Sequence, residues 1–443
     1  MFSQLKKIDK EFFIKSSASF VIRIFSQAMA LAIAVLLTRL LSVEGFGLYS
    51  ITIATVMIAA IFVKDAAHLL WTRFAANYVA EENWGALKGA LIAAFTYATL
   101  LGVGLIIILY MLRNTLVLAA GHFATAGFLI SLWLIPIVGI TFAFMGVLKG
   151  MKHVIWAQLP EFALRPFLLC LMLLVFFMWG PQTFNVETAL SIYLICAVFA
   201  LVVTVIFLIC YVPRVVWFET AQYEWKEWGK VVVPLIVTSG LILVNQNADI
   251  LMLGSIKGAE DAGLYQVATR TATLMVIVLT AVNAIITPKI AEHYAKEDLI
   301  GMQRLIYQGS LLISVLTLPL VVLFSLLAPY LLVFLYGEAY SASQTAFLFL
   351  LWAQAFNALA GPVGMVVIMT GRQKVGSICI AISTAVNIGL NAALIPNYGI
   401  NGAAIATAIS ILVWNVMLAI YVWRDLKVNC TAIPFSYYKT RKH

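Results

Sequence analysis

Charged residues are scarce in this sequence. Asp, Glu, Lys and Arg make up 11% of the 443 residues, whereas hydrophobic residues make up 63% and the mean hydropathy is +1.01. About a quarter of the residues in an ordinary soluble domain are charged, so the composition excludes that class. Runs of about 20 apolar residues recur along the chain, which is the length that a helix needs to cross a hydrocarbon core. The sequence therefore predicts an integral membrane protein.

Short strands of alternating polarity, which would indicate a membrane barrel, are also lacking. Because only helices and closed barrels satisfy every backbone polar group in lipid, we expect an all-α polytopic bundle. About 12 transmembrane helices are predicted, at 17–41, 47–78, 87–112, 123–147, 160–180, 189–212, 231–254, 263–288, 305–328, 344–370, 374–395 and 400–423.

Reactive motifs are missing as well. The five cysteines have no motif spacing, so neither a disulfide framework nor a metal site is predicted. The sequence has no Walker motif and no Gly-rich phosphate loop, and the histidines in loops have no Cys, Asp or Ser at a useful spacing. We therefore expect no catalytic residues, no metal, no cofactor and no enzymatic activity.

The basic residues are distributed unevenly between the two sides of the predicted bundle. The net charge is +9, but these residues are spread over short loops and both tails, so no nucleic-acid partner is indicated. If the N-terminus is cytoplasmic, only Arg39, Arg113 and Lys257 lie on the opposite side, apart from four basic residues inside spans. Cytoplasmic loops of membrane proteins carry the excess of Lys and Arg. We therefore expect both termini to be cytoplasmic.

An internal repeat divides the chain into halves. The segment 36–50 returns as 252–266, and in each copy a polar turn follows an apolar run before Gly-Leu-Tyr opens the next run. Six helices in each half would give both halves the same orientation, which is the parallel type of transporter repeat. We predict an N-terminal lobe at 1–212, a linker at 213–230 and a C-terminal lobe at 231–443.

The predicted linker alternates aromatic and basic residues. A cytoplasmic amphipathic helix lying in the membrane interface accounts for this pattern. A solvated connection with ordinary interfacial tryptophans accounts for it equally well, so both interpretations stay open.

The second predicted span contains several ionisable residues. Its apolar run ends at Val63, too early to cross the bilayer, so Lys64, Asp65 and His68 must lie at membrane depth if the helix spans. Asp65, His68 and Thr72 share one helical face. Ionisable groups at this depth normally face an aqueous cavity or a partner. The alternative is that Lys64 and Asp65 neutralise one another inside the bundle.

Other spans also contain charged residues. Arg23 lies in a polar stripe of the first span, although snorkelling to the interface is the alternative for a residue so near the helix start. Arg73 lies near the cytoplasmic end of the second span, and Arg270 lies in a stripe of threonines in the eighth. Asp249 follows a group of amides in the seventh, where interhelical hydrogen bonding explains the amides but not the acid. Arg165 is expected near the cytoplasmic interface.

Several short motifs carry a resemblance to a known family. They are TRLLS at 38–42, FGLY at 46–49, RFAA at 73–76, Asp249, GLYQVATR at 263–270 and YGINGAA at 398–404. With these motifs the chain resembles the polysaccharide transporters, the Wzx-type O-antigen flippases, of the multidrug, oligosaccharidyl-lipid and polysaccharide exporter superfamily. The resemblance covers nearly the whole chain.

The resemblance implies a V-shaped bundle of two six-helix lobes around a central cationic cavity. It implies a flippase that moves an undecaprenyl-diphosphate-linked oligosaccharide, such as an O-antigen repeat unit, from the cytoplasmic to the periplasmic leaflet of a bacterial inner membrane by alternating access. A diphosphate needs fixed cations. The substrate-binding residues predicted on this basis are Arg23, Lys64, Arg73 and Arg270. The residues predicted to couple H+ or Na+ are Asp65, His68 and Asp249.

Three other functions stay open. A multidrug exporter of the same superfamily is expected to favour acidic and aromatic cavity residues, and a lipid II exporter is expected to have two further helices. From a different class, the chain could be a non-transporting membrane scaffold of a polysaccharide assembly complex. The further partners implied by the resemblance are membrane lipid, a polysaccharide polymerase and a chain-length regulator.

Overall fold

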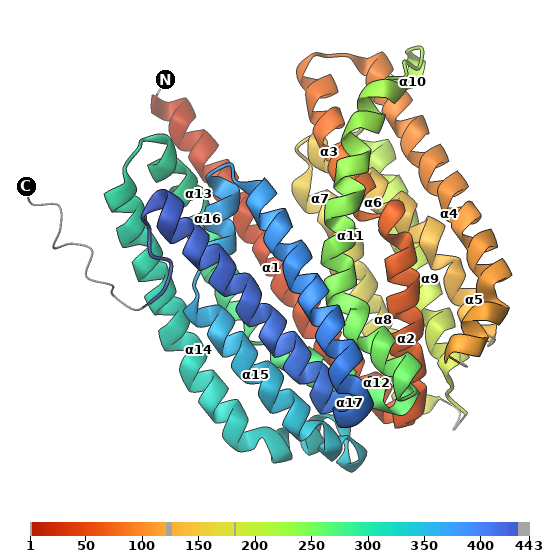
Figure 1. Ribbon diagram of the computed structural model, residues 1–443. Helices are drawn as coiled ribbons and strands as arrows, with labels where there is room; N and C mark the ends of the chain where they lie inside the picture. Colours follow the sequence, from red (N-terminus) through yellow and green to blue (C-terminus); the bar gives the residue numbers. More distant parts are fainter. Residues whose placement is uncertain (1, 121–125, 181–182, 433–443) are drawn as a thin grey trace, which may run out of the picture. The chain divides into compact units, whose positions relative to one another are not determined.

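The computed structural model describes residues 2–120, 126–180 and 183–432, and every regular element within them is a helix (Figure 1). Ten helices in these ranges are long and apolar enough to cross a membrane, or eleven if the bent pair Glu338–Leu359 and Val363–Met369 is one span. The prediction of an all-α polytopic membrane protein is confirmed. The chain divides into two compact units, Met1–Gly263 and Leu264–His443.

The first unit contains most of the helices. Its α-helices are α1 (Phe2–Leu40), α2 (Val43–Ala59), α3 (Asp65–Ala80), α4 (Trp84–Ala120), α5 (Ala126–Leu132), α6 (Leu134–Gly150), α7 (Val154–Leu159), α8 (Arg165–Trp179), α9 (Val186–Tyr211), α10 (Arg214–Phe218) and α11 (Trp225–Ile256). A 3-10 turn, η1 (Ala60–Phe62), follows α2, and a π turn, η2 (Pro160–Leu164), joins α7 to α8.

The second unit begins within α12 (Ala259–Thr273). Its other elements are α13 (Val276–Ala295), α14 (Leu299–Tyr336), the 3-10 turn η3 (Glu338–Ser343), α15 (Gln344–Leu359), α16 (Val363–Met369) and α17 (Gln373–Leu426). Its apolar core includes Val282, Ile286 and Ile306, together with Leu418 and Val422 near the end of α17.

Helix α17 holds two of the predicted spans, 374–395 and 400–423. Gly399 interrupts it with φ of 50° and ψ of −130°, which are not helical values. The Ser383 hydroxyl donates to the carbonyl oxygen of Ser410 at 2.8 Å, although 27 residues of straight helix would separate the two by about 40 Å. The chain therefore reverses at Gly399, and the two predicted spans are separate passes.

The second predicted span is present over Val43–Ala80, but it is broken. Turn η1 and Lys64 separate α2 from α3, and the Lys64 φ of −101° and ψ of −82° are not helical. The Tyr97 hydroxyl of α4 donates to the carbonyl oxygen of Phe62 at 2.8 Å, which satisfies a backbone group beside the break. Helix α3 thus begins in the middle of the span, at the ionisable residues.

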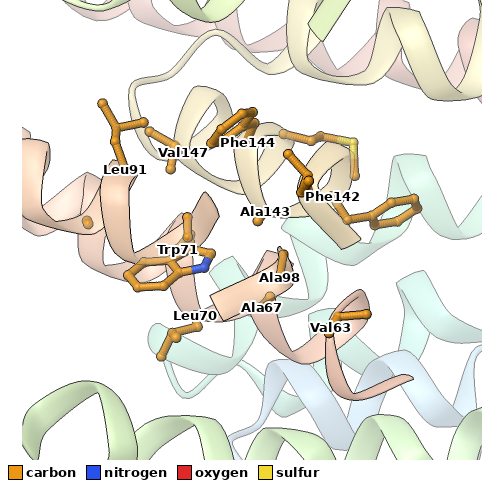
Figure 2. Close-up of a cluster of buried hydrophobic side chains, with 14 of the residues drawn as sticks. Val63, Ala67, Leu70, Trp71, Leu91, Ala98, Phe142, Ala143, Phe144 and Val147 are labelled. Carbon is orange, nitrogen blue, oxygen red and sulfur yellow. The ribbon is translucent and has the colours of Figure 1, made fainter. Parts of the chain in front are cut away.

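Helix α6 packs closely on α3 in the core of the first unit (Figure 2). Ala67 and Trp71 of α3 share a buried apolar cluster with Ala143 of α6. A Cβ on Gly146 would lie only 2.5 Å from the carbonyl oxygen of His68, so the two backbones approach as closely as they do because glycine occupies this position. The close packing brings the end of α6 beside the polar face of α3.

The two copies of the internal repeat contact each other within the first unit. A Cβ on Gly47 would lie 1.7 Å from the carbonyl oxygen of Ala259, and a Cβ on Gly263 would lie 2.5 Å from that of Val43. The glycine that both copies share is therefore needed because the two backbones cross there without room for a side chain.

The predicted linker is docked on the first unit. Within 213–230, Arg214–Phe218 forms the short helix α10 and Trp225 begins α11. Lys88 Nζ of α4 donates to the carbonyl oxygens of Trp217 and Glu219, both at 2.8 Å. Two backbone carbonyl groups of the segment are therefore held by α4, and the interfacial amphipathic helix and the solvated connection both stay predictions.

Helix α11 is fixed to α3 where it begins. The Tyr78 hydroxyl donates to the Glu224 carboxylate at 2.6 Å and accepts from the Trp228 indole at 2.8 Å. The repeat assigns α11 to the second half of the chain, yet the compact unit that contains it ends at Gly263. The predicted lobe boundaries at 212 and 231 stay predictions.

Candidate functional site

Lys64 lies at the break in the second span. Its Nζ is 3.6 Å from Asp65 Oδ2 and 4.8 Å from the centre of the Phe142 ring on α6. The ion pair matches the alternative in which Lys64 and Asp65 neutralise one another. The two side chains are nevertheless 17% and 32% exposed, so the pair is not sealed in the core.

Two aromatic rings in contact with each other connect Arg23 to Lys64. Its Cζ lies 5.6 Å from the centre of the Phe162 ring in η2, and that centre lies 6.2 Å from the centre of Phe142, with the rings edge to face. Each cation therefore lies over one ring of a contacting pair, and the attraction between a cation and a ring face stabilises the positive charge there. Both cations also interact electrostatically with His68.

His68 lies between two groups of α6. Its Nδ1 is 3.2 Å from the carbonyl oxygen of Phe142, and its Nε2 is 3.1 Å from Nζ of Lys149. A carbonyl oxygen can only accept, so Nδ1 carries the ring hydrogen and Nε2 accepts from the Lys149 ammonium. The Thr72 hydroxyl donates to the His68 carbonyl oxygen at 2.7 Å, which is a hydrogen bond within α3. We call Arg23, Lys64, His68 and Lys149 the cation group.

Lys149 is the member of this group that the sequence did not predict as a site residue. Its place at the end of α6 was interpreted only as cytoplasmic charge. Gly146 and Gly150 flank it, and a Cβ on Gly150 would lie 2.7 Å from the Thr72 carbonyl oxygen. Such small residues at four-residue spacing are typical of close helix contacts, and they were the available signal that Lys149 faces another helix.

The other three predicted residues have surroundings of their own. Arg73 is exposed, and its guanidinium lies 6.0 Å from the ring of its neighbour Phe74. Arg270 is exposed on α12, in the second unit. Asp249 is 6% exposed on α11. Of the residues predicted to couple an ion, His68 belongs to the cation group and Asp65 pairs with its member Lys64.

A second charged cluster was not predicted. Glu161 in η2 is 5% exposed, and its Oε1 lies 2.9 Å from a guanidinium nitrogen of Arg165. Arg165 also donates to the Tyr193 hydroxyl of α9 at 3.0 Å. Arg165 lies in the candidate span Val154–Trp179, and its expected place near the cytoplasmic interface stays a prediction. The four-residue spacing brings the acid and the base together on one face of the helix.

Comparison with known protein families assigns the chain to one of them. A family profile described as "Polysaccharide biosynthesis protein" matches residues 14–294, which is more than half of the chain. The chain belongs to this family. A second profile, MatE, matches residues 234–393 of this polysaccharide biosynthesis protein. The resemblance to polysaccharide transporters of the exporter superfamily is thereby confirmed.

One relative of this family member is "Probable flippase AglR" of Haloferax volcanii, 29% identical over 188 residues. The match covers 38% of this chain and 36% of the relative, so the chain spans well under half of that relative's length.

Two solved structures have a similar fold. Lipid II flippase MurJ in an inward closed conformation has a TM-score of 0.72 and 15% identity, over 93% of this chain and 87% of that one. An inward-facing multidrug resistance MATE family transporter of the MOP superfamily has a TM-score of 0.69 and 16% identity, over 92% of this chain and 98% of that one. At these identities the likeness shows a shared fold.

Proposed function

We propose that this protein is a flippase for an undecaprenyl-diphosphate-linked oligosaccharide. It moves the lipid from the cytoplasmic to the periplasmic leaflet of a bacterial inner membrane by alternating access coupled to H+ or Na+, with both termini in the cytoplasm. Membership of the polysaccharide biosynthesis family supports a role in polysaccharide assembly. The name of the relative AglR supports translocation as the step.

The cation group is the observation that carries this proposal. Arg23 and Lys64 lie over two contacting aromatic rings, Lys149 contacts His68, and Asp65 is the acid paired with Lys64. Charged groups in membrane spans are costly, so a surplus of one sign favours a role in binding the opposite charge. A diphosphate has several oxygens that accept from guanidinium and ammonium groups at once.

The remaining predicted residues belong to the same proposal. Arg73 and Arg270 supply further phosphate contacts during transport, and Asp65, His68 and Asp249 handle the coupled ion. A polysaccharide polymerase and a chain-length regulator are the proposed protein partners, because they would act on the lipid that the flippase delivers.

The test is to identify the lipid that accumulates in cells lacking the protein. Lipids extracted from these cells and from cells with a restored copy are compared by mass spectrometry. We expect an undecaprenyl-diphosphate-linked oligosaccharide to accumulate and to disappear on restoration. Accumulation of lipid II would instead assign a lipid II exporter, and drug sensitivity with unchanged lipids would assign a multidrug exporter. Full activity of a variant lacking both Arg23 and Lys64 side chains would favour a scaffold.

A further inference from the structure

The contacts of the His68 ring fit a neutral imidazole. Its Nδ1–H donates to the Phe142 carbonyl oxygen, and its Nε2 lone pair accepts from Lys149. A second ring proton would have to lie on Nε2, where it would face the Lys149 ammonium at 3.1 Å. Lys149 therefore occupies the one position at which His68 can be protonated.

Among the described residues, the charged groups that interact electrostatically with the ring are cations, and Lys149 is the one in contact with it. They are Lys149 of α6, Arg23 of α1 and Lys64 at the start of α3. Asp65 precedes His68 by three residues, but its carboxylate is paired with Lys64. Protonation of a ring among cations becomes favourable when negative charge arrives beside it.

We propose that a bound diphosphate takes Lys149 away from His68, and that His68 then takes up one proton. This inference rests on the proposed function and specifies it: Lys149 is a further diphosphate ligand, and H+ is the ion coupled at His68.

The proton balance of this step is simple. The hydrogen bond from Lys149 to His68 Nε2 breaks, and Lys149 keeps its proton and donates to a phosphate oxygen. One N–H bond forms on Nε2 with a proton from water, while Nδ1–H still donates to the Phe142 carbonyl oxygen. The imidazolium adds positive charge to the cation group, so anion binding and proton uptake favour one another.

The exchange makes diphosphate binding depend on pH. Because the bound state holds one more proton than the free state, affinity rises as pH falls, by up to about tenfold per pH unit where the ring is neutral before binding. When the diphosphate is released at higher pH, His68 returns its proton to water. Lys149 then donates to His68 Nε2 again.

Calorimetric titration of the purified full-length protein in detergent tests the inference. The probes are inorganic pyrophosphate and a prenyl diphosphate, each titrated at pH 6.5 and 7.5 in buffers that differ in ionisation enthalpy. Wild-type protein should take up as much as about one proton more per bound anion than His68→Asn. The comparison between variants matters because diphosphates themselves titrate in this range, and Asn keeps a donor for the Phe142 carbonyl oxygen.

Lys149→Met separates this exchange from simple electrostatic attraction. It should weaken binding roughly tenfold or more through loss of a charged hydrogen bond. It should also lower the pH-linked proton uptake, because Nε2 no longer faces an ammonium and can be protonated before the anion arrives. Lys230→Met is the matched control, because Lys230 is exposed and pairs with Glu227. It should bind as wild type does.

Each result has a distinct meaning. Equal proton uptake by wild type and His68→Asn, with normal binding, would overturn the inference alone. No binding of either probe by folded protein would overturn both the inference and the proposed function. Binding of pyrophosphate only, with uptake that depends on His68, would support the exchange and reject the lipid as its source.

Discussion

The first unit contains two charged clusters that differ in how their charges are balanced. Glu161 pairs with Arg165, whose guanidinium also reaches Tyr193, so both ionic groups have partners within the protein. In the cation group, Lys149 contacts His68, Arg23 and Lys64 interact with it electrostatically, and Asp65 is the acid paired with Lys64. A buried pair with satisfied hydrogen bonds can hold helices together, whereas surplus positive charge calls for an anion from outside. The comparison separates a structural cluster from a binding cluster.

The largest effect on stability should come from breaking the balanced cluster. Glu161→Leu leaves the Arg165 charge buried without its carboxylate, which should cost about 3–5 kcal/mol of unfolding free energy. The double variant Glu161→Leu, Arg165→Met should recover most of that loss, because it removes both charges. Thermal unfolding of the purified proteins in detergent measures both. An unchanged melting temperature for Glu161→Leu would show that the pair is not structural.

A smaller loss should follow from filling the contact between the repeat copies. Gly47→Ala places a Cβ where the Ala259 carbonyl oxygen lies, so the backbones must separate, at about 1–3 kcal/mol. Gly104→Ala on α4 is the control, because its Cβ would meet no atom within 4 Å. It should be neutral or slightly stabilising. Equal melting temperatures for the two variants would refute a required close contact at Gly47.

The smallest effect should come from an exposed charge outside both clusters. Asp298 caps α14, where it accepts from the Gly301 amide at 2.8 Å and lies 2.9 Å from His293 Nδ1. The Gly301 amide first, and then His293, lower the pKa of this carboxyl. A lowered acid pKa adds stability that is present above the unfolded pKa and is lost as pH falls through the folded one.

Replacement of this cap should therefore act weakly and only where the carboxyl is charged. Asp298→Ala should lower the melting temperature slightly at neutral pH, and the difference from wild type should shrink as pH falls through the lowered pKa of the folded state. Melting curves across pH 3 to 7 measure this. A difference that grows toward low pH would contradict the assigned direction of the pKa.

The fold was predictable where the signal was local. The reversal at Gly399 follows a Pro-Asn-Tyr-Gly segment that is typical of a turn, and the repeated Gly-Leu-Tyr lies where the two backbones cross. The break before Lys64 was not predictable in the same way, because Ala60–Phe62 contains no glycine or proline. Its stabilisation comes from Tyr97, which is distant in sequence.

In the candidate site, too, local signals could be read from the sequence and contacts between distant residues could not. Arg23, Lys64 and His68 could be predicted because charged and titratable residues in an apolar span are conspicuous in a sequence. Lys149 could not, because a lysine at a helix end is ordinary, and only the packing of α6 on α3 brings it to His68. Glu161 was missed although it lies four residues before Arg165, a spacing that places an acid and a base side by side on a helix.

The most direct test of the account is delivery of the lipid-linked oligosaccharide to the outer leaflet in cells, normalised to protein level. Arg23→Ala and Lys64→Met should each lower delivery by roughly tenfold or more, because each removes a charged hydrogen bond to the diphosphate. Arg23→Lys should recover part of the activity, since it keeps the charge but loses the paired donors. Arg270→Ala, tested alongside, is predicted to lose delivery as well, whereas Lys230→Ala should deliver normally. Wild-type delivery by both Arg23→Ala and Lys64→Met would contradict a diphosphate site in the cation group.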